Sequence, residues 1–246
     1  MWEGQCCAGC RKNLDPLGDR AASCPVSGRI KLRSGPLEKT WARVLREARC
    51  RVREMCCFET AAEPGIDPAD GRKIEVVATG LPMARGLPVA VDATIVSPLH
   101  ADGTAWKEAA AKPGISFGRA RTSKQRTYPE LFRSTTVHMV VAAAETGGRL
   151  SRESLEVLAA AAALRAKDEP RPLRRQAARA WRARWCAMLS VAIQDALAAT
   201  LVSEGSRCLD APAGSAPPST DVWLDGNALA RDFDDGCAYR GAGACP

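Results

Sequence analysis

Long apolar runs are missing from this chain. No uninterrupted apolar segment reaches the length of about 18–20 residues that a membrane-spanning helix needs. The first residues also lack a basic segment followed by an apolar one, which is the pattern of a secretory signal. We therefore expect an intracellular protein without a membrane partner.

Histidine is equally scarce, since the chain has 2 histidines, His100 and His138. Neither has the surroundings of a good metal ligand, and His138 lies in an apolar strand pattern, where a core or edge position is more common. Cysteine is plentiful, but its 11 residues are an odd number and several stand alone. This usage favours reduced thiols in an intracellular chain over a disulfide scaffold.

The composition allows a substantial hydrophobic core. Of the 246 residues, 46% are apolar, which is enough for one generous domain or two small ones. The net charge of +7 favours an acidic partner such as nucleic acid or an anionic surface. This preference is mild, because 28 acidic residues are interspersed among the basic ones.

Hydrophobic periodicity predicts an α/β or α+β fold, with a small mixed sheet flanked by helices. Helical spacing of apolar residues predicts helices at residues 36–48, 117–132, 151–166 and 173–202. Runs rich in β-branched residues predict strands at residues 50–56, 73–78, 88–96 and 137–143. A further short helix is one option at residues 104–111.

The ends of these elements have recognisable signals. Ser34 or Gly35 can cap the first helix, and Pro129 should end or kink the second. Ser151 has the pattern of a helix start. From residue 203 the chain is rich in Gly, Pro, Ser and Asp and has no periodicity, which indicates a disordered tail after the long helix.

Two acidic residues interrupt the second and third predicted strands. Glu75 and Asp92 each stand within an apolar, β-branched run. A carboxylate is costly to bury in such a strand unless it is paired or holds a metal. If the two strands pair, both carboxylates can reach one point and bind Mg²⁺. The alternative, at even odds on spacing alone, is a pair of edge strands whose acids face water.

Lys124 is the candidate partner of these acids. It lies four residues before Tyr128, so both side chains share one face of the predicted helix. A lysine at such a site can orient the attacking water or hold a phosphate. The alternative is an ordinary solvated helix lysine.

Three segments carry a resemblance to a known family. Residues 71–77, 87–99 and 124–128 resemble the restriction-endonuclease-like domain at the C-terminal end of site-specific non-LTR retrotransposon proteins. They resemble more closely a family of uncharacterised retroelement-derived reading frames. The similarity covers residues 7–202, and the Asp-Ala-Thr-Ile-Val-Ser-Pro segment that begins at Asp92 is its most specific part.

The resemblance implies a restriction-endonuclease-like, PD-(D/E)xK-type core that nicks DNA with Mg²⁺. DNA is then the expected partner, and a nuclear location is one option. Glu75 matches the first acid, which is usually Asp, and Asp92 matches the second. Thr94 stands where the wider superfamily has Lys, and Lys124 matches the lysine that the retroelement branch carries on the next helix. Asp67 or Asp70 could replace Glu75.

The departure at Glu75 leaves other functions open. One alternative is a non-catalytic nucleic-acid-binding remnant that keeps the fold. Another is a retroelement fragment without a selected role. The resemblance assigns residues 34–202 to the restriction-endonuclease-like domain and leaves residues 203–246 as the tail.

A cysteine-rich segment at residues 1–33 resembles the zinc knuckle that precedes this core in the same family. Cys7, Cys10 and Cys24 match three zinc ligands, but Arg20 stands where the family has histidine. Arginine stays protonated and does not bind zinc. Cys6 could supply the fourth ligand of a Zn²⁺ site, and the alternative is a vestigial knuckle with free thiols.

The long predicted helix begins with a cluster of arginines. Its functional interpretation is a phosphate-contacting surface beside a nuclease cleft, formed by Arg174, Arg175, Arg179 and Arg182. The alternative, slightly favoured, is a solvated polar face of an amphipathic helix. Trp181 and Trp185 fall on the apolar face, where a core position is expected rather than stacking on bases.

Overall fold

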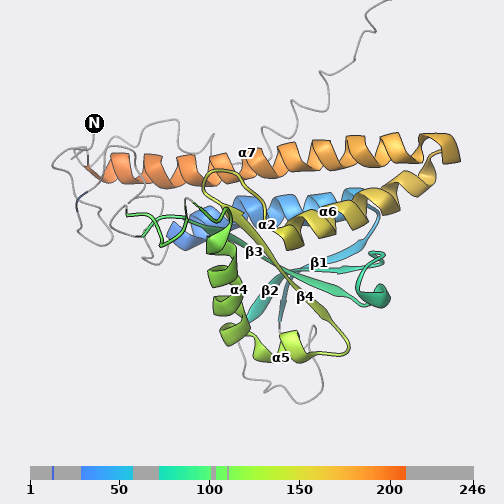
Figure 1. Ribbon diagram of the computed structural model, residues 1–246, viewed down its shortest axis with the longest axis horizontal. Coiled ribbons are helices and arrows are strands. Elements are labelled where there is room, and N and C mark those ends of the chain that lie inside the picture. Colours follow the sequence, from blue (N-terminus) through green and yellow to red (C-terminus); the bar gives the residue numbers. More distant parts are fainter. Residues whose placement is uncertain (1–12, 14–28, 58–71, 101–103, 110, 209–246) are drawn as a thin grey trace, which may run out of the picture. The chain divides into compact units, whose positions relative to one another are not determined.

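The computed structural model describes residues 13, 29–57, 72–100, 104–109 and 111–208 (Figure 1). The predicted zinc ligands Cys7, Cys10 and Cys24 lie outside the described residues, as do the alternative acids Asp67 and Asp70. The same holds for residues 209–246 of the predicted tail. Among the described residues, no helix is both long enough and apolar enough to cross a membrane.

A four-stranded mixed sheet forms the centre of the fold, as the sequence predicts. Its strands lie in the order of the chain, β1 (Arg51–Cys57), β2 (Lys73–Thr79), β3 (Val89–Val96) and β4 (His138–Glu145). Strand β2 is antiparallel to both β1 and β3, whereas β4 runs parallel to β3. A parallel pair needs a long crossover connection, which explains why helices separate β3 from β4.

The crossover contains α4 (Ile115–Thr127) and α5 (Pro129–Arg133), which pack against β4. Pro129 separates the two helices, which confirms the predicted break. Gly114 precedes α4 with φ 81°, and a Cβ there would lie 2.8 Å from the Phe117 ring. Glycine therefore fixes the start of the helix that carries Lys124.

The other helices form two further layers. The first layer contains α2 (Arg29–Glu47) and α6 (Arg152–Arg165), which contact the sheet, and the outer α7 (Arg174–Cys208) packs on both (Figure 1). Short 3₁₀ turns complete the described elements, η1 (Ala84–Gly86), η2 (Ala166–Asp168) and η3 (Arg171–Leu173). Ser151 caps α6 by accepting a hydrogen bond from the Ser154 backbone N–H, as predicted.

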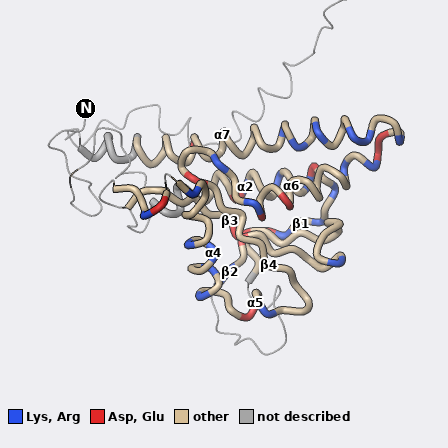
Figure 2. The backbone as a smooth tube through the Cα atoms, viewed as in Figure 1, with Lys and Arg blue, Asp and Glu red and all other residues tan. Residues whose placement is uncertain are grey.

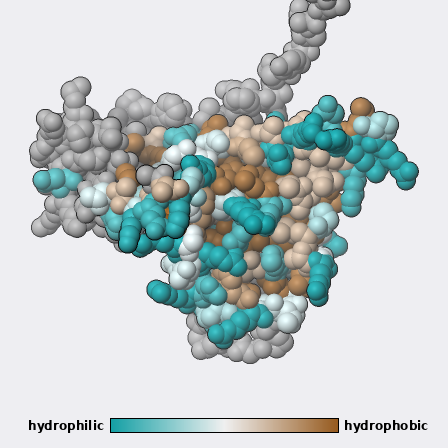
Figure 3. Space-filling model, viewed as in Figure 1, coloured by the Kyte–Doolittle hydropathy of each residue, from teal (hydrophilic) through white to brown (hydrophobic). Residues whose placement is uncertain are grey.

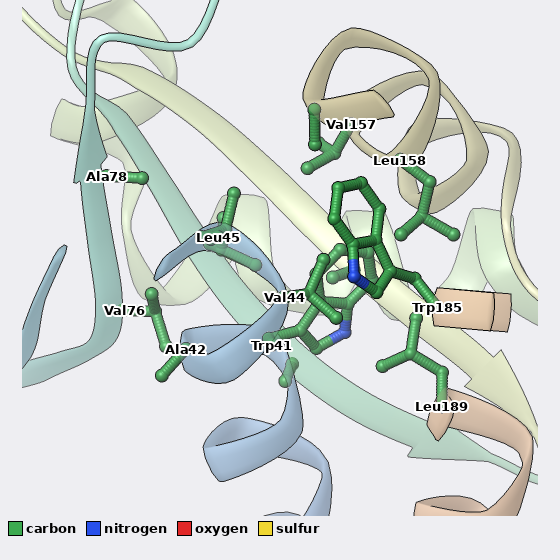
Figure 4. Packing of buried hydrophobic residues seen from close by; sticks show 14 of the residues in the cluster. Trp41, Ala42, Val44, Leu45, Val76, Ala78, Val157, Leu158, Trp185 and Leu189 are labelled. Carbon is green, nitrogen blue, oxygen red and sulfur yellow. The ribbon is translucent and has the colours of Figure 1, made fainter. Parts of the chain in front are cut away.

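The main hydrophobic core lies between the sheet and these helices (Figure 4). Trp41 from α2 and Trp185 from α7 are fully buried there, beside Leu158 from α6. The Trp185 indole N–H donates to Glu47 Oε2 over 2.8 Å, so its polar atom is satisfied as well. Trp185 is thus a core residue, as its place on the apolar face predicted.

Three boundary predictions were wrong. Helix α2 begins at Arg29, so Ser34 and Gly35 lie inside it rather than capping it. Pro36 is accommodated because its φ suits a helix and it removes a single backbone hydrogen bond. Residues 104–109 form turns instead of a helix, and α7 continues to Cys208, six residues into the predicted tail.

Candidate active site

Strand pairing brings Glu75 and Asp92 to neighbouring positions on adjacent strands. Val76 pairs with Val91, so the next positions along the two strands are Glu75 and Asp92. Asp92 has 0% exposed surface, and one carboxylate oxygen of Glu75 is buried too. The alternative of two acids that face water is therefore wrong, because the central strand β3 is covered on both sides.

Helix α4 places Lys124 directly on Asp92. The Lys124 Nζ atom lies 2.7 Å from Asp92 Oδ1, and 24% of the lysine side chain is exposed. The lysine also lies near the Tyr128 ring, 5.9 Å from its centroid. Lys124 is therefore not a solvated helix lysine, since it forms a largely buried ion pair with a strand carboxylate.

The environment raises the pKa of both carboxyl groups. Burial raises the pKa of Glu75 to about 8, and the negative charge of Asp92 adds to this, whereas Lys124 opposes it. Burial also raises the pKa of Asp92 above its usual value, against the lowering effect of Lys124. Glu75 consequently holds its proton at neutral pH in the absence of a cation.

The oxygen atoms suit a divalent cation. Asp92 Oδ2 and Glu75 Oε2 are buried without a hydrogen-bond partner among the described residues. Unsatisfied buried oxygens are rare, and a bound cation would satisfy both of them. The described part of the chain holds no group of three or more His, Cys, Asp or Glu side chains placed for a metal. Mg²⁺ fits such a site, because it needs one or two protein carboxylates and keeps several waters.

A cavity of about 1060 Å³ opens beside this pair of acids. It is lined by Glu75 and Lys124, by Ala93 and Thr94 of β3, and by the exposed face of α4. In the space-filling view, hydrophilic surface gathers over α4 (Figure 3). The site is therefore an open recess, lined by both charged and apolar side chains, from which a phosphate could approach the Asp92–Lys124 pair.

The regular alternation of β2 is broken near Glu75. Ile74 and Val77 pack in the same hydrophobic cluster, although they are three positions apart and regular alternation would place them on opposite faces of the strand. On β1, Met55 stands at the position between the pairs that flank Glu75, and its φ is 49°.

The arginines of α7 do not belong to this cavity. Arg174, Arg175, Arg179 and Arg182 are exposed, and none of them lines it. In Figure 2, the positions coloured as charged residues in α4 and in the first half of α7 lie on separate parts of the backbone tube. Arg174 instead donates to the backbone carbonyls of Glu169 and Lys167, which holds the turn before α7.

Several residues of the cavity were missed by sequence reasoning. Glu38 of α2 lines it, and its negative charge contributes to the raised pKa of both Glu75 and Asp92. Arg119 and Arg126 of α4 also line it. Their spacing of seven residues on the helix of Lys124 was a usable signal, because such positions share one face. Glu38 gave no comparable signal, since a charged residue on an amphipathic helix is ordinary.

Two comparisons with known proteins gave no relative: no protein-family model matches this chain, and no curated protein matches it.

Proposed function

We propose that this protein is a metal-dependent DNA endonuclease of the restriction-endonuclease-like type, related to retroelement nucleases. The observation that carries the proposal is the buried Asp92–Lys124 ion pair beside Glu75, at the edge of an open cavity. Ion pairs of this kind are costly inside a protein, and strongly perturbed carboxyl groups in a cleft are characteristic of functional sites.

The topology supports the same proposal. A helix, three antiparallel strands, a helical crossover and a parallel fourth strand agree with a restriction-endonuclease-like core. In this core the two acids stand on the second and third strands and the lysine stands on the crossover helix, the arrangement that the sequence resemblance implies.

Each residue then has a distinct role. Asp92 and Glu75 would hold Mg²⁺, which when bound lowers the pKa of a water and offsets the negative charge of the phosphate. To hold the cation, Glu75 would release its proton to solvent, and Asp92 would share its carboxylate between Lys124 and the cation. Lys124 Nζ is then able to donate to a phosphate oxygen or to the attacking water.

A second candidate function is DNA binding without hydrolysis. It is favoured by the protonated state of Glu75 at neutral pH and by the neutralisation of Asp92 by Lys124, because both reduce the attraction for a cation. The two candidates differ in a single observable, which is the metal-dependent nicking of DNA.

The test is incubation of the full chain with supercoiled plasmid and Mg²⁺, followed by quantitation of the nicked form. We expect Asp92→Asn and Lys124→Met to lower the nicking rate by at least about 10²-fold, because each removes a group from the reacting centre. Glu156→Gln is the matched control, since this glutamate is exposed on α6 and pairs with Arg152.

Nicking by the wild type and by Glu156→Gln, together with its loss in Asp92→Asn, would support hydrolysis at this site. Equal nicking by wild type and Asp92→Asn would assign the activity to a contaminant. No nicking by the wild type over a range of Mg²⁺ and Mn²⁺ concentrations would favour the binding function.

A further inference from the structure

Three side chains are stacked at the rim of the cavity. The ring centroids of His100 and Trp106 lie 3.3 Å apart, and the Arg119 guanidinium carbon lies 3.3 Å from the Trp106 centroid. All three line the same cavity as Glu75 and Lys124. A guanidinium is thus held by a cation–π contact in the same cavity as Glu75 and Lys124.

The backbone holds Trp106 in this position. Leu99 and Ala105 form an antiparallel bridge, and the Trp106 N–H donates to the Pro98 carbonyl over 3.1 Å. The His100 N–H donates to the Thr104 carbonyl over 2.7 Å. The backbone of Trp106 is therefore held against the segment that follows β3.

Arg119 has no acidic partner. Among the described residues it makes no hydrogen bond or ion pair, and its contact with Trp106 leaves the five guanidinium N–H groups available. Arg121, two residues further along α4, forms an ion pair with Glu153 and lies over the Phe132 ring. Arg119 is thus held in place but has no acidic partner among the described residues, whereas the guanidinium of Arg121 is already engaged in structural contacts.

The spacing along α4 suits a nucleic acid strand. Arg119 precedes Lys124 by five residues, or about 7.5 Å along the helix axis. One strand of DNA carries a phosphate for every 3.4 Å or so of its rise, so this offset corresponds to about two nucleotides. Arg119 can therefore reach a phosphate near the one that Lys124 would contact.

We propose that Arg119, held by its cation–π contact with Trp106, binds a phosphodiester that flanks the scissile one on the same DNA strand. The planar fork of arginine binds two phosphate oxygens at once, and the indole fixes the direction of that fork. Trp106 is then a positioning residue, and Arg119 is a binding residue. This assignment rests on the proposed function for the identity of the ligand, but its test does not require hydrolysis.

The test is equilibrium binding of a short fluorescent single-stranded DNA to the full chain in EDTA, by anisotropy at several salt concentrations. We expect Arg119→Met to weaken binding about fivefold and to reduce the slope of log K against log salt by about one, since one phosphate contact is lost. Arg119→Lys should keep the slope and lose part of the affinity. The affinity of Trp106→Leu for the DNA probe should be intermediate between the affinities of Arg119→Met and the wild type.

The matched control is Arg133→Met. Arg133 is an exposed arginine of α5 that does not line the cavity, and its variant removes the same charge. Equal affinity and equal salt slope for Arg119→Met and Arg133→Met would overturn the assignment, whether or not the wild type nicks DNA. A selective loss for Arg119→Met without any nicking by the wild type would support it and would overturn hydrolysis alone. Wild-type binding by Trp106→Leu would overturn the positioning role.

Discussion

The core between the sheet and the helices α2, α6 and α7 differs sharply from the region between the sheet and α4. The first buries two tryptophans among aliphatic side chains, and among the described residues its one buried side-chain polar atom without a hydrogen-bond partner is Trp41 Nε1. The second buries Asp92 under Lys124 and leaves carboxylate oxygens unsatisfied beside an open cavity. We infer that the first region supplies most of the stability of the fold. The second region retains buried polar groups that are costly and whose presence is not explained by packing.

The largest effect on stability should come from the apolar region. Leu158→Ala removes a fully buried side chain of α6, and we expect the free energy of unfolding to fall by about 3 kcal/mol. Urea denaturation followed by circular dichroism measures this change. Leu155→Ala, on the exposed face of the same helix, should cost less than about 1 kcal/mol. Similar losses for both variants would contradict the assignment of the core.

A smaller effect, dependent on pH, should come from the polar region. The pKa of Glu75 is about 8 in the folded protein and near 4.5 in the unfolded chain. Between these values the folded state holds a proton that the unfolded chain has released, so stability falls as pH rises from about 4.5 to 8. Glu75→Gln removes this dependence, and it should be more stable than the wild type by on the order of 2 kcal/mol above pH 8.

Thermal unfolding in EDTA between pH 5 and pH 9 measures this difference. Asp92 is electrostatically coupled to Glu75, so this difference reports the titration of the pair rather than of Glu75 alone. A constant difference between Glu75→Gln and the wild type over this range would show that Glu75 titrates normally.

The smallest effect should come from the arginines of α7. Arg175 and Arg179 are exposed and do not line the cavity, so the double variant Arg175→Gln/Arg179→Gln should change stability by less than about 0.5 kcal/mol. We expect its affinity for the DNA probe to fall less than that of Arg119→Met. A larger loss of affinity than that of Arg119→Met would show that the principal DNA-binding surface lies on α7 rather than on α4.

The elements themselves were largely predictable from the sequence, because they depend on local periodicity. The four strands, the break at Pro129 and the cap at Ser151 follow from patterns within a few residues. The start of α2 and the end of α7 were not predictable. Helix α2 begins seven residues before Pro36 and α7 continues past residue 202, so both helices pass local signals that normally end a helix.

The site was predictable only in part. Glu75, Asp92 and Lys124 could be singled out because carboxylates within apolar strands are unusual and because the flanking residues resemble a known family. The direct contact between Lys124 and Asp92 could not be derived, since the position of α4 over β3 depends on a crossover of many residues. Trp106 and Glu38 gave no signal because each has an ordinary neighbourhood in the sequence.

The most direct test of the polar region is a calorimetric titration of the full chain with Mg²⁺ and Mn²⁺. We expect one site in the wild type, the same site in Glu156→Gln, and at least about tenfold weaker binding in Asp92→Asn, since a carboxylate ligand is lost. Equal binding by Asp92→Asn and the wild type, or no binding by the wild type in the millimolar range, would contradict a metal centre at Glu75 and Asp92.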